Sequence, residues 1–173
     1  GVFEESELSL VDKNNFWMVV CTNTQLEWVL NSKPFHQFNV FIKIDTGMGR
    51  LGFQGNEAIQ AVDALENSQN IKNVTFMTHF SSADNLESNS TKNQNEEFKN
   101  IIKSKQNDQS LANSAALMAW KNTHSEYTRP GIMLYGSSPF PFNDKFKDLA
   151  PAMKLESSLI SIKKFKAGTA IGY

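Results

Sequence analysis

Short apolar runs alternate with helical patterns along the chain, an order that is typical of a parallel α/β sheet or barrel. Residues 16–21, 40–44 and 74–77 form apolar runs and predict three strands. The run at residues 40–44 is apolar nearly throughout, which indicates a strand that is covered on both faces. Two more strands are predicted, a short one near Leu111 and another at residues 132–134.

Helical patterns separate these runs. Residues 22–25 (TNTQ) match a capping box, and the apolar residues of the helix that follows are Leu26, Val29 and Leu30. A second helix is predicted by helical spacing of Ala58, Ile59, Val62 and Leu65. The polar tract at residues 85–95 predicts a solvated loop, and TKNQ at residues 91–94 predicts the cap of a helix that buries Phe98, Ile101 and Ile102. A short helix is predicted from Ser114 to about Trp120.

The character of the sequence changes after Gly136. Residues 137–142 (SSPFPF) cannot be helical, because two prolines remove hydrogen-bond donors and bias the preceding residues to extended geometry. The stretch up to Pro151 is typical of a linker. Residues 153–164 then alternate in part between apolar and polar positions, which predicts a first strand of a β domain.

Composition adds mainly exclusions. The 173 residues are 40% hydrophobic and carry a formal net charge of −1, as an ordinary soluble globular protein does. Because no basic block stands out, we expect neither nucleic acid nor a membrane as a partner. Three histidines and one cysteine show no metal-ligand spacing, so no metal is expected, and Cys21 is interpreted as a small core residue. No signal peptide or long apolar span is evident, so we expect a cytoplasmic protein.

Residues 41–53 (FIKIDTGMGRLGF) carry the most informative pattern in the chain. A buried strand ends at Asp45, and Lys43 and Arg50 flank a tight glycine-containing loop at that end, where α/β barrels place their chemistry. This run resembles a signature of alanine racemases, pyridoxal-phosphate-dependent enzymes that interconvert L- and D-alanine. Four more blocks resemble the same family in the same order: residues 78–84 (THFSSAD), 113–116 (NSAA), 129–136 (RPGIMLYG) and 166–173 (KAGTAIGY).

The resemblance implies the fold and the limits of the chain. It predicts an α/β protein in which residues 1–150 form the later strands and helices of a (β/α)8 TIM-type barrel with a linker. Residues 151–173 are then the beginning of a C-terminal β domain. The family's lysine, which forms a Schiff base with the cofactor, has no matching motif here, and a whole barrel needs roughly 250 residues. We therefore expect a fragment of such an enzyme that has no racemase activity alone.

Three residues are implied to be catalytic. Tyr173 matches the family's tyrosine, which acts on one face of the substrate from the neighbouring subunit. An unperturbed phenol has a pKa of about 10, so this tyrosine needs a positive neighbour to act as a base near neutral pH. His79 and Arg129 match the histidine that contacts this tyrosine and the arginine that contacts the cofactor's pyridine ring, so both also bind the cofactor. The alternatives are an ordinary strand tyrosine and a surface salt-bridging arginine; Pro130-Gly131 argues against the latter, because the glycine suits close approach to a ligand.

The remaining implied site residues bind the cofactor's other groups. The Ser114 hydroxyl and the backbone N–H groups of Gly131 and Ile132 match the phosphate site, although Ser114 could equally be a plain helix N-cap. Arg50 matches the arginine that contacts the cofactor's phenolic oxygen and the substrate carboxylate. Lys43 matches a lysine that is carbamylated in several members; an unmodified or snorkelling lysine is the alternative.

The sequence thus predicts a piece of a pyridoxal 5'-phosphate alanine racemase, with alanine as substrate and a homodimer as its assembly. In this family, D-alanine usually supplies peptidoglycan synthesis. A racemase of broader amino-acid specificity is one alternative, because specificity lies partly outside these motifs. A non-catalytic protein derived from a racemase is another, because the lysine motif is missing.

Overall fold

The computed structural model describes residues 3–103, 105–140 and 148–172. Within these residues, five parallel strands form one sheet in chain order: β1 (Trp17–Val20), β2 (Phe38–Lys43), β3 (Ile71–Met77), β4 (Gln109–Asn113) and β5 (Tyr127–Arg129). The α-helices are α1 (Leu8–Asn14), α2 (Asn23–Asn31), α3 (Gly55–Glu66), α4 (Ser90–Ile102) and α5 (Ser114–Ala119). Short 3-10 helices are η1 (Glu5–Glu7), η2 (Lys121–Thr123) and η3 (Ile132–Tyr135). The strands predicted at residues 16–21, 40–44 and 74–77 and near Leu111 are confirmed.

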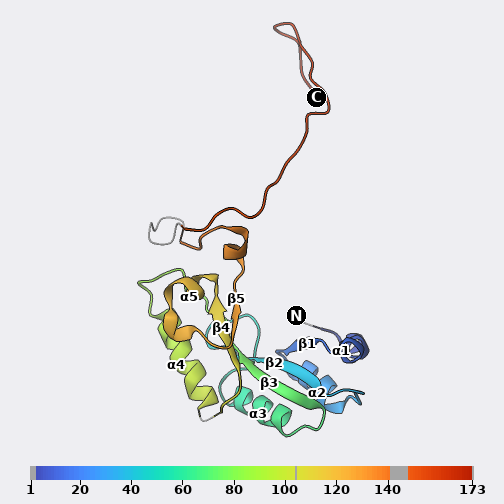
Figure 1. Cartoon of the computed structure of the whole chain (residues 1–173), viewed down its shortest axis with the longest axis vertical. Helices are drawn as coiled ribbons and strands as arrows, with labels where there is room; N and C mark the ends of the chain where they lie inside the picture. The colour runs from blue at the N-terminus through green and yellow to red at the C-terminus, as the bar shows by residue number, and fades with distance from the viewer. Residues whose placement is uncertain (1–2, 104, 141–147, 173) are drawn as a thin grey trace.

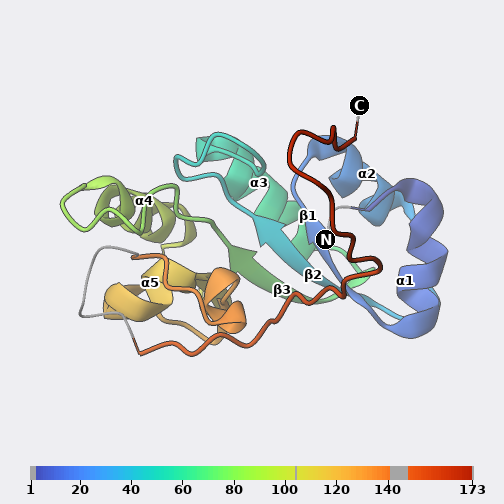
Figure 2. The same ribbon diagram turned by 90° about the horizontal axis from the view of Figure 1, so that it is seen from above.

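The sheet curls, and aromatic side chains show how far. The rings of Trp17 on β1 and Tyr127 on β5 lie 6.1 Å apart, although these strands are at opposite edges of the described sheet. Phe41 on β2 completes a triangle with these two rings, 5.2 Å from Trp17 and 5.6 Å from Tyr127. Helices α2, α3 and α4 lie side by side along the outer side of the sheet (Figures 1 and 2). A curled parallel sheet with helices outside it is part of an α/β barrel, as the sequence predicted.

The core lies between the helices and the sheet. Val40 and Ile42 point to the same face of β2 and are completely buried, whereas Phe41 and Lys43 on the opposite face are half-buried, so the predicted covering of both faces is only partial. Ala58, Val62 and Leu65 of α3 are buried as predicted, whereas Ile59 is 37% exposed. None of the helices in the described ranges has the length and apolar character needed to cross a membrane.

The start of α2 follows the sequence signal only in part. Thr22 caps the helix, because its Oγ1 accepts a hydrogen bond from the Gln25 N–H at 3.2 Å. The second bond of a capping box, from the Thr22 N–H to the Gln25 side chain, is not formed. Gln25 Oε1 instead accepts a hydrogen bond from the Cys21 N–H at 3.0 Å. Cys21 is buried, as expected of a core residue.

The strand predicted at residues 132–134 is wrong. Strand β5 ends at Arg129, and the apolar residues form the 3-10 helix η3 instead. Pro130 has no N–H to continue a ladder, and η3 leaves Ile132 50% and Leu134 62% exposed. The apolar run therefore marks a surface turn and not a buried strand.

The polar tract at residues 85–95 is only partly a loop, because α4 begins at Ser90. The cap is Asn89, and Thr91, Gln94 and Asn95 are buried inside the helix. Because polar side chains occupy the buried face of the first turns of α4, the sequence there shows no apolar periodicity that would predict a helix.

Residues 148–172 contain no regular element, so the strand predicted at residues 153–164 is not formed. Every residue from 150 to 172 is exposed, and this segment extends away from the sheet and helices in Figure 1. A strand needs a neighbour to pair with its backbone, and none of the described strands pairs with this segment. Its assignment to a second domain stays a prediction. The linker residues 141–147 and Tyr173 lie outside the described residues.

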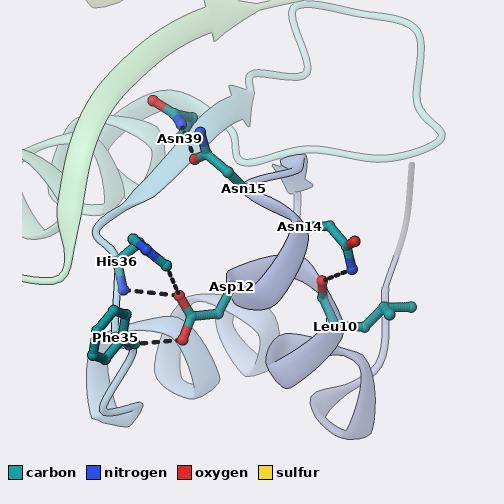
Figure 3. Close-up of polar contacts among 7 residues, drawn as sticks. All are labelled: Leu10, Asp12, Asn14, Asn15, Phe35, His36 and Asn39. Atoms are coloured by element: carbon teal, nitrogen blue, oxygen red, sulfur yellow. Dashed lines mark hydrogen bonds and ion pairs between the residues drawn. The ribbon is translucent and has the colours of Figure 1, made fainter.

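An acidic side chain joins α1 to the segment before β2 (Figure 3). The Asp12 carboxylate accepts hydrogen bonds from the backbone N–H groups of Phe35 at 2.7 Å and His36 at 2.8 Å, which lower the pKa of this carboxyl. The Asn39 side chain on β2 donates to the Asn15 side chain, which follows α1, at 3.1 Å. These bonds join the N-terminal helix to the segment that enters β2 and to β2 itself.

Candidate active site

Polar and charged residues lie at the carboxyl ends of four adjacent strands or just after them. Lys43 is the last residue of β2, and Arg129 is the last residue of β5. His79 lies two residues after β3, and Ser114 directly follows β4. Because parallel strands end at the same edge, the fold brings together residues that are far apart in sequence. This edge is where barrels of this type carry their active sites.

The loop after β2 is built around Asp45. The carboxylate of this buried residue accepts hydrogen bonds from the backbone N–H groups of Gly47, Met48 and Gly49 at 2.8 to 3.1 Å, and from the Gln54 side chain at 3.1 Å. Burial raises the pKa of Asp45, but these hydrogen bonds outweigh it and hold the pKa below its ordinary value. Asp45 therefore shapes the turn.

A close backbone contact joins the two ends of the loop after β2. Ile44 forms a bridge with Phe53, and the Phe53 N–H donates to the Lys43 carbonyl at 2.9 Å. Gly52 permits this approach, since a Cβ there would lie 2.7 Å from the Lys43 oxygen. The loop presents Arg50, an exposed residue that lines a hollow of about 330 Å³ with Cys21, Asp45 and Gln54 among others.

The Arg129 guanidinium links β5 to β4 and to the residue that follows β3. Its Nη1 donates to the Ser110 carbonyl at 2.7 Å and to Ser110 Oγ at 2.5 Å, and its Nη2 donates to the Thr78 carbonyl at 2.5 Å. No carboxylate of the described residues forms an ion pair with it. Burial lowers the pKa of Arg129 to about 10, so the side chain stays protonated at neutral pH.

His79 lies beside this arginine and is neutral. Burial lowers the pKa of His79 to about 4, and the charges of Arg129, Lys43 and Arg50 contribute to the shift. His79 Nδ1 is 3.4 Å from Arg129 Nη2. Because a guanidinium can only donate, Nδ1 is the accepting nitrogen of this contact, and the ring proton belongs on Nε2.

Ser114 and Gly131 meet at the ends of β4 and β5. Ser114 Oγ accepts a hydrogen bond from the Gly131 N–H at 2.8 Å. Asn113, not Ser114, caps α5, because its Oδ1 accepts from the Ala116 N–H at 3.0 Å. The interpretation of Ser114 as a plain N-cap is therefore wrong, and its hydroxyl faces the turn after β5.

These groups surround a hollow of about 380 Å³, which is within the range of small-molecule sites. Five of the predicted site residues line it, namely His79, Ser114, Arg129, Gly131 and Ile132. Arg50 and Lys43 do not line it, but both lower the pKa of His79 and thus act on the same site. Tyr173 lies outside the described residues, so its predicted role stays a prediction.

Sequence reasoning missed several residues at this site. Asn113, Asp84, Ala115 and Pro139 also line the hollow. Asn113 and Asp84 belong to the motifs quoted above, so their positions were available, but their types gave no separate signal. Gln94 was also missed: it reaches the loop of His79 from α4.

Comparisons with known proteins identify the family of this chain. The family model described as alanine racemase, N-terminal domain, matches residues 1–139. An alanine racemase of Pseudomonas savastanoi pv. phaseolicola is 38% identical over 177 residues, which cover 100% of this chain and 49% of that protein. A catabolic alanine racemase of Pseudomonas aeruginosa is 37% identical over 174 residues, covering 100% of this chain and 49% of that protein.

Solved structures give the same result. The biosynthetic alanine racemase of Pseudomonas aeruginosa superposes with a TM-score of 0.82 at 32% identity, covering 87% of this chain and 42% of that one. An alanine racemase of Clostridium difficile superposes with a TM-score of 0.81 at 30% identity, covering 94% of this chain and 48% of that one. The chain thus spans about half the length of the curated relatives it matches.

Proposed function

The chain belongs to the family of the alanine racemase N-terminal domain, and we propose that it forms part of the active site of a pyridoxal 5'-phosphate-dependent alanine racemase. The reaction is the interconversion of L-alanine and D-alanine by removal of the Cα proton from one face and return of a proton to the other. The proposal includes a cytoplasmic location and a homodimer, in which the Tyr173 of one subunit acts in the site of its partner.

The observation that carries this proposal is the pair formed by Arg129 and His79. A protonated guanidinium lies at the hollow, satisfied by backbone carbonyls and next to a neutral imidazole. An arginine in that state cannot readily give a proton to a heterocyclic nitrogen. It can only donate a hydrogen bond, which leaves the nitrogen of a bound ring unprotonated.

The residues of the hollow fit pyridoxal phosphate. The Ser114 hydroxyl and the N–H group of Ile132 would hold the phosphate, together with the Gly131 N–H once it is released from Ser114 Oγ, and Arg129 would contact the ring nitrogen. Three cations, Lys43, Arg50 and Arg129, lie close enough to lower the pKa of His79, so the site favours an anionic ligand. When bound, the cofactor supplies an electron sink that makes the Cα proton of an amino acid more acidic.

His79 would act on Tyr173 by hydrogen bonding. Its Nδ1 faces the Arg129 donor, which leaves the Nε2–H free to donate to a phenolate oxygen. A hydrogen bond to the charged form lowers the pKa of a phenol. This arrangement prepares Tyr173 to accept a proton near neutral pH without requiring a charged imidazole.

Arg50 and Lys43 would serve the substrate side. Arg50 is exposed on a loop that Asp45 holds rigidly, so its guanidinium can pair with a carboxylate. Burial lowers the pKa of Lys43, and the charges of Arg50 and Arg129 lower it further. A neutral amine can add to carbon dioxide, giving a carbamate anion and a proton, and this anion could then pair with Arg50.

The proposal is tested by racemisation with the full-length native protein that contains this chain, loaded with pyridoxal phosphate, because the chain alone is expected to have no racemase activity. We expect D-alanine to form from L-alanine, with slower turnover of L-serine and L-lysine. The variant Arg129→Ala should lose this activity, whereas Lys105→Ala, which removes a surface ion pair with Asp63 and Glu66, should keep it. Equal turnover of all three amino acids would favour a broad-specificity racemase, and no turnover with bound cofactor would overturn the proposal.

A further inference from the structure

We propose that Gln94 is a positioning residue that holds the loop of His79 against the loop of Arg50. Gln94 lies on α4, outside the hollow, and is 3% exposed. Its side chain nevertheless reaches the segments that follow β2 and β3. The function served by this arrangement rests on the proposed racemase site, but the arrangement itself does not.

The amide of Gln94 holds the backbone on both sides of Phe80. Its Nε2 donates to the His79 carbonyl at 3.1 Å. Its Oε1 accepts from the Ser81 N–H at 2.9 Å and from the Ser81 hydroxyl at 3.1 Å. Phe80 itself is 2% exposed. The Gln94 side chain therefore fixes the main chain before and after Phe80. The position of the His79 backbone, from which its ring projects, is fixed with it.

The same amide reaches the loop after β2. Gln94 Nε2 also lies 3.5 Å from Thr46 Oγ1, and a Cβ placed on Gly47 would lie 3.4 Å from Gln94 Cγ. Thr46 in turn shares a hydrogen bond of 2.8 Å with Thr78. Thr46 and Gly47 belong to the turn that Asp45 organises and that ends at Arg50. Gln94 thus packs between the two loops and is bonded to both.

Two other buried polar residues on α4 show that burial alone does not give a side chain the hydrogen bonds that Gln94 makes to the two loops. Thr91 and Asn95 are as buried as Gln94, with exposures of 0% and 3%. In the described residues, Thr91 Oγ1 and Asn95 Oδ1 have no hydrogen-bond partner. The oxygen and nitrogen of Gln94 are both satisfied, and their partners belong to the two loops. Thr91→Val therefore removes a buried hydroxyl from the same helix without removing a hydrogen bond to either loop.

The experiment compares Gln94→Met, which keeps the size of the side chain, with Gln94→Asn, which keeps its chemistry but is one methylene shorter. The native protein and Thr91→Val are the controls. The first readout is the NMR titration of the His79 ring, which requires no catalytic activity. The second readout is kcat and KM for L-alanine. A milder variant is included because the methionine leaves Ser81 and His79 without partners and can fail to fold.

We expect the pKa of His79 to rise from about 4 towards 6.5 in both Gln94 variants, because a loosened loop exposes the ring and moves it from Arg129. It should stay unchanged in Thr91→Val. We further expect kcat/KM to fall about 10- to 100-fold, mostly in kcat, as misplaced catalytic groups do. A lower melting temperature with an unchanged His79 titration in the folded Gln94→Asn would overturn the proposal. Absence of racemase activity in the native protein with the expected titration would instead overturn only the proposed function.

Discussion

Nη2 of Arg129 lies 3.4 Å from Nδ1 of His79, although 50 residues separate them in the sequence. The guanidinium comes from the end of β5, and the imidazole follows β3. Strand β4, which lies between them, contributes the Ser110 carbonyl and hydroxyl that hold Nη1. The contact therefore depends on the register of three strands, and it makes the two side chains one unit.

Arg129→Lys should damage this unit while keeping the charge. A lysine is a point donor and cannot reach the carbonyls of Ser110 and Thr78 together. Since the buried Thr78 carbonyl and Ser110 hydroxyl lose this donor, we expect the free energy of unfolding to fall by about 1–3 kcal/mol. Urea denaturation measures this, and spectroscopic titration with pyridoxal phosphate should show weaker binding. Lys105→Arg at a surface ion pair is the control, for which a change under about 1 kcal/mol is expected. Unchanged stability and binding in Arg129→Lys would contradict the geometry.

His79 should stay neutral at every pH above about 4. Its pKa is lowered in the folded protein, so the unfolded chain, with a pKa near 6.5, takes up the proton first. Stability should therefore fall as the pH drops from about 6.5 to 4, and above 6.5 the residue should contribute no pH dependence. Denaturation curves across this range measure the effect. The slope should become flatter in His79→Gln, and an identical slope would show that His79 is not responsible.

Gly52→Ala should destabilise the loop that carries Arg50. A Cβ at Gly52 would lie 2.7 Å from the Lys43 oxygen, and its φ is +123°. Gly55→Ala is the matched control, since Gly55 also has a positive φ, +46°, but nothing lies within 4 Å of its added Cβ. We expect about 1–3 kcal/mol of backbone strain in each and a further loss at Gly52 from the clash. Thermal melts of both variants separate the two effects, and equal losses would exclude the clash.

Lys43 should take up carbon dioxide. Its lowered pKa increases the fraction of neutral amine, which is the reactive form. Native protein equilibrated with 13C-labelled bicarbonate should give a carbamate carbon signal that is absent from Lys43→Arg. Arg50→Lys, which keeps a charge on the loop, tests whether the partner guanidinium stabilises the carbamate. A native spectrum without this signal would mean that Lys43 stays unmodified.

The sequence predicted the strands of the sheet well, because the apolar runs around Val40, Val74 and Leu111 are buried and paired. The sequence-based prediction failed where apolar residues are exposed and where polar residues are buried. Ile132 and Leu134 are apolar but exposed on a 3-10 helix after Pro130. Thr91 and Gln94 are polar but buried in α4. Such cases depend on contacts between distant segments, which periodicity does not report.

In the candidate site, too, some residues were predicted from the sequence and others were not. His79, Ser114 and Arg129 were predicted from motifs, and the structure brings them to one hollow. The role of Asn113 as cap and the reach of Gln94 to His79 were not predicted. A glutamine in a polar helix looks solvated from the sequence alone, and only the packing of α4 against two loops gives it partners.

The most direct measurement follows the Cα proton itself. L-Alanine is incubated in deuterium oxide with the native protein loaded with pyridoxal phosphate, and both enantiomers are analysed for deuterium at Cα. A racemase should produce D-alanine that carries deuterium at Cα, and Arg129→Ala should not. L-Alanine that keeps its proton and its configuration in the presence of cofactor-loaded protein would contradict the proposed reaction.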